Sequence, residues 1–173
     1  MDWSKRWIVA SILGCILLTP IGAAADDLMG PITTTRTITT DSRLIGDVTC
    51  MVTGAPCIAF GAPHISLRLN GFTITGQADP NTACGGAIQA NEQGISSNNQ
   101  ANIEIRGPGV VQRFRADGVL FVGTQLGKIE GVTTTTNCQS GIRVTATASR
   151  ISIAGNISVR NGSTNAGAAC GGI

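Results

Sequence analysis

The sequence predicts an all-β solenoid, a coil of short strands that stack on the equivalent strands of the next turn. No helical period follows Ala25, and short apolar alternations rich in Ile, Val and Thr dominate instead, with Gly and Asn between them. A Gly followed by a β-branched residue recurs at intervals of 24, 23 and 31 residues, at Gly94, Gly118, Gly141 and Gly172. A period of about 20–30 residues with several short strands per period indicates a solenoid.

A second alternation recurs inside these units and divides each turn into short strands. Copies of this alternation begin at Ile65, Ile103, Ile129 and Ile151. Three short strands per turn fit the pattern, because a leucine-rich repeat would need a Leu and Asn consensus that the sequence lacks. Stacked turns lie about 4.8 Å apart. We therefore expect inward ladders of Ile and Val and turn ladders of Asn, with Asn137 and Asn161 as two rungs of one ladder.

The first 25 residues have the pattern of a bacterial-type signal peptide. Lys5 and Arg6 form a short basic start, residues 7–18 are almost wholly apolar, and the small residues Ala23 and Ala25 fit cleavage after Ala25. The mature protein is therefore expected to be secreted or periplasmic, without a membrane span. The alternatives are an uncleaved anchor, for which the apolar run is short, and lipidation at Cys15, after which the sequence stays apolar instead of turning polar.

Composition excludes some partners and sets the domain organisation. Only 13% of the 173 residues are charged, the net charge is +2, and no Lys/Arg block follows the first few residues, so we expect no nucleic-acid partner. Low charge also suits stacked strands, since like charges on adjacent rungs repel. The expected organisation is a signal peptide at 1–25, an N-terminal cap with the first strands at 26–63, and coils at 64–173.

One stretch resembles a known superfamily. Residues 67–76 read Leu-Arg-Leu-Asn-Gly-Phe-Thr-Ile-Thr-Gly, which resembles the leading coil of secreted bacterial right-handed parallel β-helix proteins, and residues 38–50 resemble the usual approach to it. The resemblance covers roughly residues 32–173 and implies a right-handed parallel β-helix of the pectate-lyase-like superfamily. That superfamily includes pectate lyases, polygalacturonases, alginate epimerases, phage tailspikes, surface adhesins and a periplasmic copper-assembly factor, so it implies little about function.

The end of the sequence carries a further expectation. The chain stops at Cys170-Gly171-Gly172-Ile173, where a new coil is expected to begin and no capping segment follows. We therefore expect a fragment of a longer β-helix whose coils are incomplete at the C-terminus. The alternative is a naturally short chain that dimerises end to end.

The search for catalytic motifs yields none, and the catalytic residues are unknown. The resemblance implies an Asp/Glu cluster with an Arg base in pectate lyases, Asn-Thr-Asp, paired Asp, Gly-His-Gly and Arg-Ile-Lys in polygalacturonases, and Asp-Pro-His-Asp in epimerases. None of these strings is present, and His64, the only His, follows Pro63 in a turn-like stretch. We expect an exported, non-catalytic scaffold without cofactor or metal. The alternative is the N-terminal part of a polysaccharide lyase, glycosidase or epimerase whose catalytic coils lie beyond residue 173.

One charged group predicts a binding face. In the run 113–118, alternate residues Arg113, Arg115 and Asp117 are expected on one face of a strand, with Phe114 inward. Two guanidiniums beside a carboxylate can hold a uronate carboxylate in a bidentate fashion, so the expected partner is a polysaccharide or cell-surface glycan. The alternative is a solvated strand with surface ion pairs. Stacking in register would extend this group into a basic strip of Arg106, Arg143, Arg150 and Arg160.

The mature chain keeps five cysteines, and export permits disulfides. Cys50 and Cys57 are close enough in sequence to close a small loop. Cys84, Cys138 and Cys170 share a Gly-rich context, and we expect Cys138 to pair with Cys170 if they occupy one corner of successive coils. Reduced, buried cysteines are the alternative. With no Cys-X-X-Cys motif and a single His, a zinc site is not expected.

Overall fold

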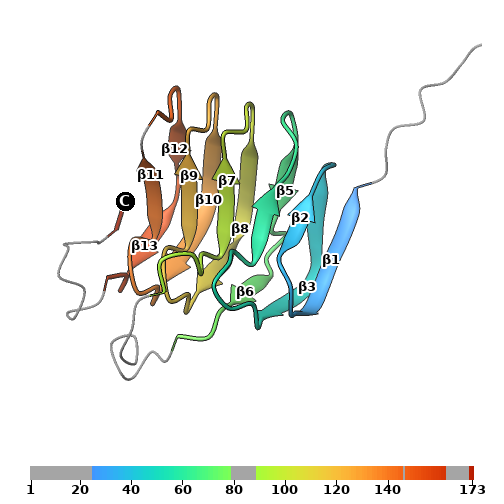
Figure 1. The fold of residues 1–173 in the computed structure, drawn as a ribbon, viewed down its shortest axis with the longest axis vertical. Helices are drawn as coiled ribbons and strands as arrows, with labels where there is room; N and C mark the ends of the chain where they lie inside the picture. Colours follow the sequence, from blue (N-terminus) through green and yellow to red (C-terminus); the bar gives the residue numbers. More distant parts are fainter. Residues whose placement is uncertain (1–24, 79–88, 146, 163–171) are drawn as a thin grey trace, which may run out of the picture.

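The computed structural model describes residues 25–78, 89–145, 147–162 and 172–173, and this part of the chain is all-β. Its strands form two sheets in which every pairing is parallel, which confirms the predicted all-β, parallel organisation (Figure 1). The signal-peptide prediction falls on residues 1–24, outside the described residues. Among the described residues, no helix is long and apolar enough to cross a membrane.

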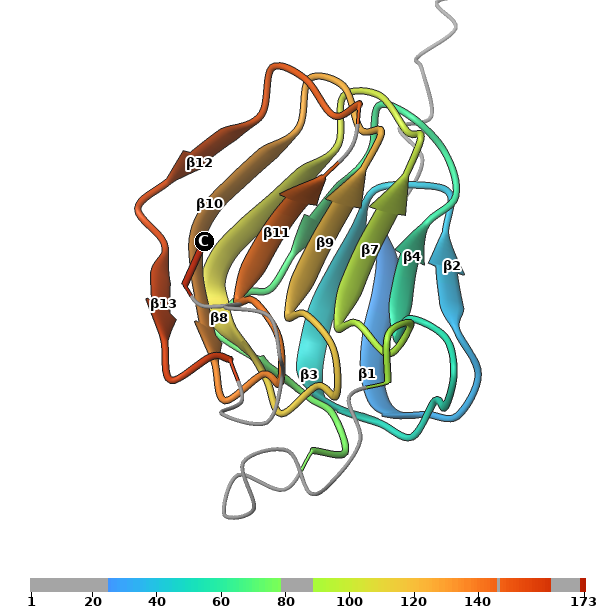
Figure 2. The same cartoon turned by 60° about the vertical axis from the view of Figure 1, so that its left-hand side comes forward.

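The chain alternates between the two sheets, so each turn adds strands to both (Figure 2). The larger sheet contains β1 (Asp26–Ile32), β3 (Ser42–Cys50), β5 (Ser66–Arg68), β6 (Thr73–Thr75), β8 (Glu104–Gln112), β10 (Lys128–Thr135), β12 (Ser152–Ala154) and β13 (Ile157–Val159). The smaller sheet contains β2 (Arg36–Ile38), β4 (Ile58–Phe60), β7 (Ile95–Asn98), β9 (Val119–Val122) and β11 (Ile142–Thr145). This order is that of a β-solenoid, with the hydrophobic core between the sheets.

The recurring Gly-Ile and Gly-Val pairs mark the first residues of stacked strands. Ile95 pairs with Val119 and Val119 with Ile142 in the smaller sheet, and all three side chains are fully buried. The glycines before them are required by the close approach of the turns. A Cβ at Gly118 would lie 2.7 Å from the carbonyl oxygen of Gly141, nearer than packed atoms approach. The predicted repeat is therefore confirmed, and its glycines are explained by backbone contact between turns.

The second predicted alternation forms the inner ladder of the larger sheet. Leu67 pairs with Ile105, Ile105 with Ile129, and Ile129 with Ile153. Three strands per turn are predicted, but the turns that contain β8 and β10 have two. In these turns, the two segments that correspond to β5 and β6, or to β12 and β13, form one long strand. A register shift beside Gly131, which has a φ of 68°, bends β10 at the junction.

The corners between sheets are also stacked. His64, Asn102, Leu126 and Arg150 all have positive φ and occupy the same corner in successive turns. His64 is exposed at this corner, as expected of a turn residue. At another corner the predicted asparagine ladder is confirmed, because both the backbone N–H and the side-chain amide of Asn137 donate to Oδ1 of Asn161, at 3.0 and 2.9 Å.

Candidate functional site

The predicted charged group lies on a corner of the solenoid. β8 ends at Gln112 and β9 begins at Val119, so the chain turns between them, and Arg113 has a left-handed backbone with a φ of 60°. The expectation that Arg113, Arg115 and Asp117 share one face of a strand is therefore wrong. Phe114 does point into the core, as predicted.

The two arginines of this corner are held by separate partners. The Nε of Arg113 donates to the carbonyl oxygen of Ala78 at 2.8 Å. Arg115 donates from Nε and a terminal nitrogen to the two oxygens of Glu92, at 2.5 and 2.9 Å. Glu92 is nearly buried, and so the pair fixes the corner against the preceding turn.

Asp117 is fully buried and joins two turns. Its Oδ1 accepts a hydrogen bond from the N–H of Ser140 at 3.0 Å, and its Oδ2 lies 2.7 Å from a guanidinium nitrogen of Arg143. Burial raises the pKa of Asp117, while the charge of Arg143 and these hydrogen bonds oppose the rise. The three predicted side chains thus make structural contacts and do not converge. A binding role for them stays a prediction.

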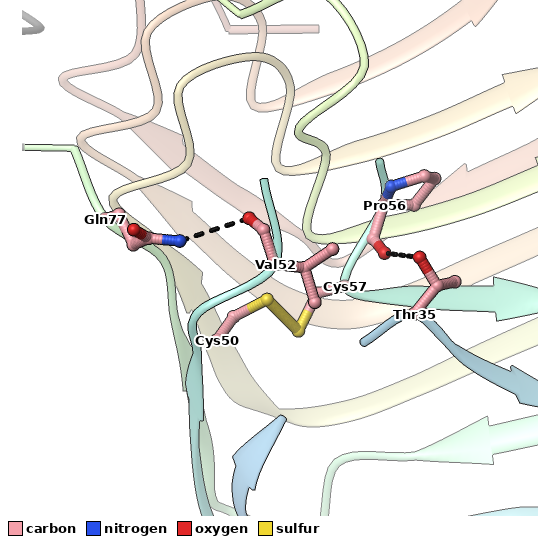
Figure 3. The surroundings of a disulfide bond; sticks show 6 residues. All are labelled: Thr35, Cys50, Val52, Pro56, Cys57 and Gln77. Carbon is pink, nitrogen blue, oxygen red and sulfur yellow. Dashed lines mark hydrogen bonds between the residues drawn. A yellow bond between two sulfur atoms is a disulfide. The ribbon is translucent and has the colours of Figure 1, made fainter. Parts of the chain in front are cut away.

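The predicted small disulfide loop is confirmed and is tied to neighbouring turns. Cys50 and Cys57 are bonded, with Cα atoms 5.9 Å apart. Figure 3 shows the side-chain amide of Gln77 donating to the carbonyl oxygen of Val52 and the hydroxyl of Thr35 donating to that of Pro56. Within the same loop, the N–H of Gly54 donates to Oε1 of Glu92 at 2.8 Å.

Only one cysteine of the other predicted disulfide, Cys138, lies in the described part of the chain. Cys138 is buried and disulfide-bonded. The expected bond between Cys138 and Cys170 lies outside the described residues, as does Cys84.

An arginine ladder crosses the outer face of the larger sheet. Arg43 on β3 pairs in register with Arg68 on β5, and Arg68 pairs with Arg106 on β8. The three side chains are exposed on adjacent rungs, which lie about 4.8 Å apart in a sheet. Parallel stacking thus brings together three cations that are far apart in the sequence.

Carboxylates neutralise the two outer arginines of this ladder. Asp27 accepts from Arg43 at 2.6 Å, and Glu104 accepts from Arg106 at 2.6 Å. These hydrogen bonds hold the pKa of Asp27 and that of Glu104 below their ordinary values. Arg68, in the middle, makes no ion pair and no side-chain hydrogen bond with any described residue. Its side chain is exposed to solvent.

Two hollows flank Arg68 along the solenoid axis. One, of about 180 Å³, reaches toward Arg43, and the other, of about 240 Å³, reaches toward Arg106. Both hollows include Asp41, Ser66 and Arg68, so they form one groove, which we call the Arg68 groove. Oδ1 of Asp41 accepts from the N–H and hydroxyl of Ser66, at 2.7 and 3.0 Å, which fixes this carboxylate in the groove floor.

His64 and Asn102 lie at the rim of the larger hollow. The side-chain amide of Asn102 is 3.1 Å from Nδ1 of His64, so the two left-handed corner residues hold each other across adjacent turns. Guanidinium, carboxylate, amide and imidazole groups therefore surround one solvent-open groove. Such groups can bind an anion together with hydroxyl groups.

Sequence reasoning selected Arg106 but placed it in the wrong strip and missed Arg43 and Arg68. Arg143 lies on β11 of the smaller sheet, while Arg150 and Arg160 lie at two different corners. The predicted strip is therefore wrong. One signal was available, because Leu67-Arg68-Leu69 and Ile105-Arg106-Gly107 are equivalent stretches of the inner alternation.

No group of three potential metal ligands from His, Cys, Asp and Glu occurs among the described residues.

Comparisons with protein-family models, with curated proteins and with solved structures find no match to this chain.

Proposed function

We propose that this protein is an exported, non-catalytic β-solenoid scaffold that binds an acidic polysaccharide in the Arg68 groove. The observation that carries the proposal is the guanidinium of Arg68, which no described carboxylate pairs with and which lies between two other arginines on the sheet. A guanidinium binds a carboxylate or sulfate through two parallel hydrogen bonds. The ladder runs along the solenoid axis, which suits an extended ligand more than a compact one.

We further propose that the solenoid is a right-handed parallel β-helix of the pectate-lyase-like kind. Its support is the run at residues 67–76 and the general right-handed preference of parallel crossover connections. Export is supported by the pattern of residues 1–25 and by the disulfide between Cys50 and Cys57, since such bonds persist in oxidising compartments.

The non-catalytic role is supported by how the carboxylates of the groove are engaged. Asp27 and Glu104 are each bonded to an arginine, and Asp41 accepts two hydrogen bonds from Ser66. The hydrogen bonds from Arg43 and Arg106 lower the pKa of Asp27 and that of Glu104. A general acid near neutral pH needs the opposite shift.

The test is binding of the full-length expressed protein to immobilised polysaccharides. We expect acidic polymers, such as polygalacturonate, alginate and hyaluronan, to bind, and dextran not to bind. Arg68→Gln should weaken binding at least about tenfold, since one charge-assisted contact contributes about 1.5–3 kcal/mol. Arg160→Gln is the matched control, with the same charge change at a distant corner.

Equal loss in the two variants would show a general charge effect and would contradict a site at Arg68. Release of unsaturated uronides or reducing ends from the polymers would contradict the non-catalytic role.

A further inference from the structure

We infer that the Arg68 groove selects copolymers in which acidic sugars are separated by neutral ones, over homopolymers of acidic sugars. This inference rests on the proposed function and narrows its ligand class. Three arginines in a ladder would by themselves indicate three positions for anions. The carboxylates around the ladder leave only one such position, at Arg68.

The first step is the charge of each rung. Arg43 and Arg106 are bonded to Asp27 and Glu104, and each of these pairs is formally neutral. Lys128, next along the sheet, is 2.6 Å from Glu130 and 3.4 Å from Glu104, so these two carboxylates, Lys128 and Arg106 form one network without net charge. Arg68 is the one cation of the ladder without a carboxylate partner among the described side chains. The groove therefore offers one guanidinium that no described carboxylate pairs with.

The second step is the lining of the hollows on either side. The larger hollow contains the carboxylates of Asp41 and Glu104 together with Arg68 and Arg106. The smaller hollow also contains Asp41. An acidic group in either hollow, next to one already on Arg68, would face a fixed carboxylate at short range, and like charges there repel.

The third step is the kind of ligand group that these carboxylates can bind. An ionised carboxylate only accepts hydrogen bonds, and a sugar hydroxyl can donate to it. The amide of Asn102 and the imidazole of His64 at the rim can bond further hydroxyl or amide groups. The two hollows thus suit neutral sugars, and the centre between them suits one acidic sugar.

The experiment compares two polymers on the full-length protein at matched acid-group concentration and ionic strength. Hyaluronan, in which glucuronate alternates with N-acetylglucosamine, is the copolymer, and polygalacturonate is the homopolymer. We expect hyaluronan to bind at least about tenfold more tightly per acidic group. Equal binding, or tighter binding of polygalacturonate, would leave the proposed function standing and overturn this inference. If neither polymer bound, the proposed function itself would fail.

A second variant tests the cause of the selectivity. Glu104→Gln frees Arg106 from its carboxylate and removes a negative charge from the larger hollow. We expect polygalacturonate affinity to rise several-fold and hyaluronan affinity to change little. Glu130→Gln removes the same charge from the other carboxylate of this network, and because Glu130 lines neither hollow it should leave the polymer preference unchanged. An unchanged polymer preference in Glu104→Gln, in a variant with wild-type thermal stability, would overturn the inference.

Discussion

Asn137 shows how one side chain holds successive turns together. Its Oδ1 accepts from the N–H of Phe114 at 3.0 Å, and its amide donates to the carbonyl oxygen of Val111 and to Asn161. The side chain is almost fully buried. Removing it leaves buried backbone groups without partners, which is costly because water cannot replace the lost bonds.

Asn137→Ala should therefore lower the free energy of unfolding by about 3 kcal/mol, as measured by denaturant titration. Asn98→Ala is the control, since Asn98 is exposed on β7, and it should change stability by less than about 0.5 kcal/mol. Similar losses for the two variants would contradict a special role for the asparagine ladder.

The buried carboxyl of Asp117 makes the stability of the protein depend on pH. Burial raises the pKa of Asp117 above its ordinary value of 3.8. At pH values between the unfolded and the folded pKa, the folded protein therefore retains a proton that the unfolded chain has lost. This contribution to stability is fully present below the unfolded pKa and disappears as the pH rises through the folded pKa.

Asp117→Asn removes this titration while keeping an oxygen for the N–H of Ser140. The free energy of unfolding of the wild type minus that of the variant should increase as the pH falls from about 6 to about 4. Denaturant titrations across this range measure it. A difference that stays constant, or that shrinks toward low pH, would contradict the direction of the shift.

Among the elements, the disulfide loop between β3 and β4 acts as a strap across several turns. It bonds to Thr35 in the turn before and to Gln77 and Glu92 in the turn after. Replacing both Cys50 and Cys57 by Ala should lower the free energy of unfolding by about 2–3 kcal/mol, the loop-closure value for so short a loop. Thr35→Val, which removes one hydrogen bond from the same loop, should cost about 1 kcal/mol. If the double cysteine variant is no less stable than Thr35→Val, the disulfide does not hold these turns together as described.

The strands were predictable where contact between turns constrains the residue type. Gly118 must be a glycine because a Cβ would strike the next turn, so its recurrence in the sequence marks strand starts. The corner at 113–118 was not predictable in this way. Its left-handed residue is Arg113, where Gly or Asn would have signalled a turn. The alternation of Arg113, Phe114 and Arg115 then has the pattern of a strand.

For the whole molecule, the groove arises from stacking and not from any local motif. Arg43, Arg68 and Arg106 are separated by unequal stretches of chain, since an insertion precedes β7. Only the register of β3, β5 and β8 brings them onto one line. Sequence reasoning predicted the solenoid but not this surface, because an outward position has no burial requirement that would reveal its register.

The central claim is that the free guanidinium of Arg68 binds the acidic group of a glycan. The most direct measurement is a titration of ¹⁵N-labelled protein with hyaluronan oligosaccharides, following the Nε–Hε signals of the arginines. We expect the Arg68 signal to move most, while the signals of Arg115 and Arg143, which are held by Glu92 and Asp117, stay in place. Movement at Arg115 or Arg143 without movement at Arg68, or no movement at any arginine, would contradict it.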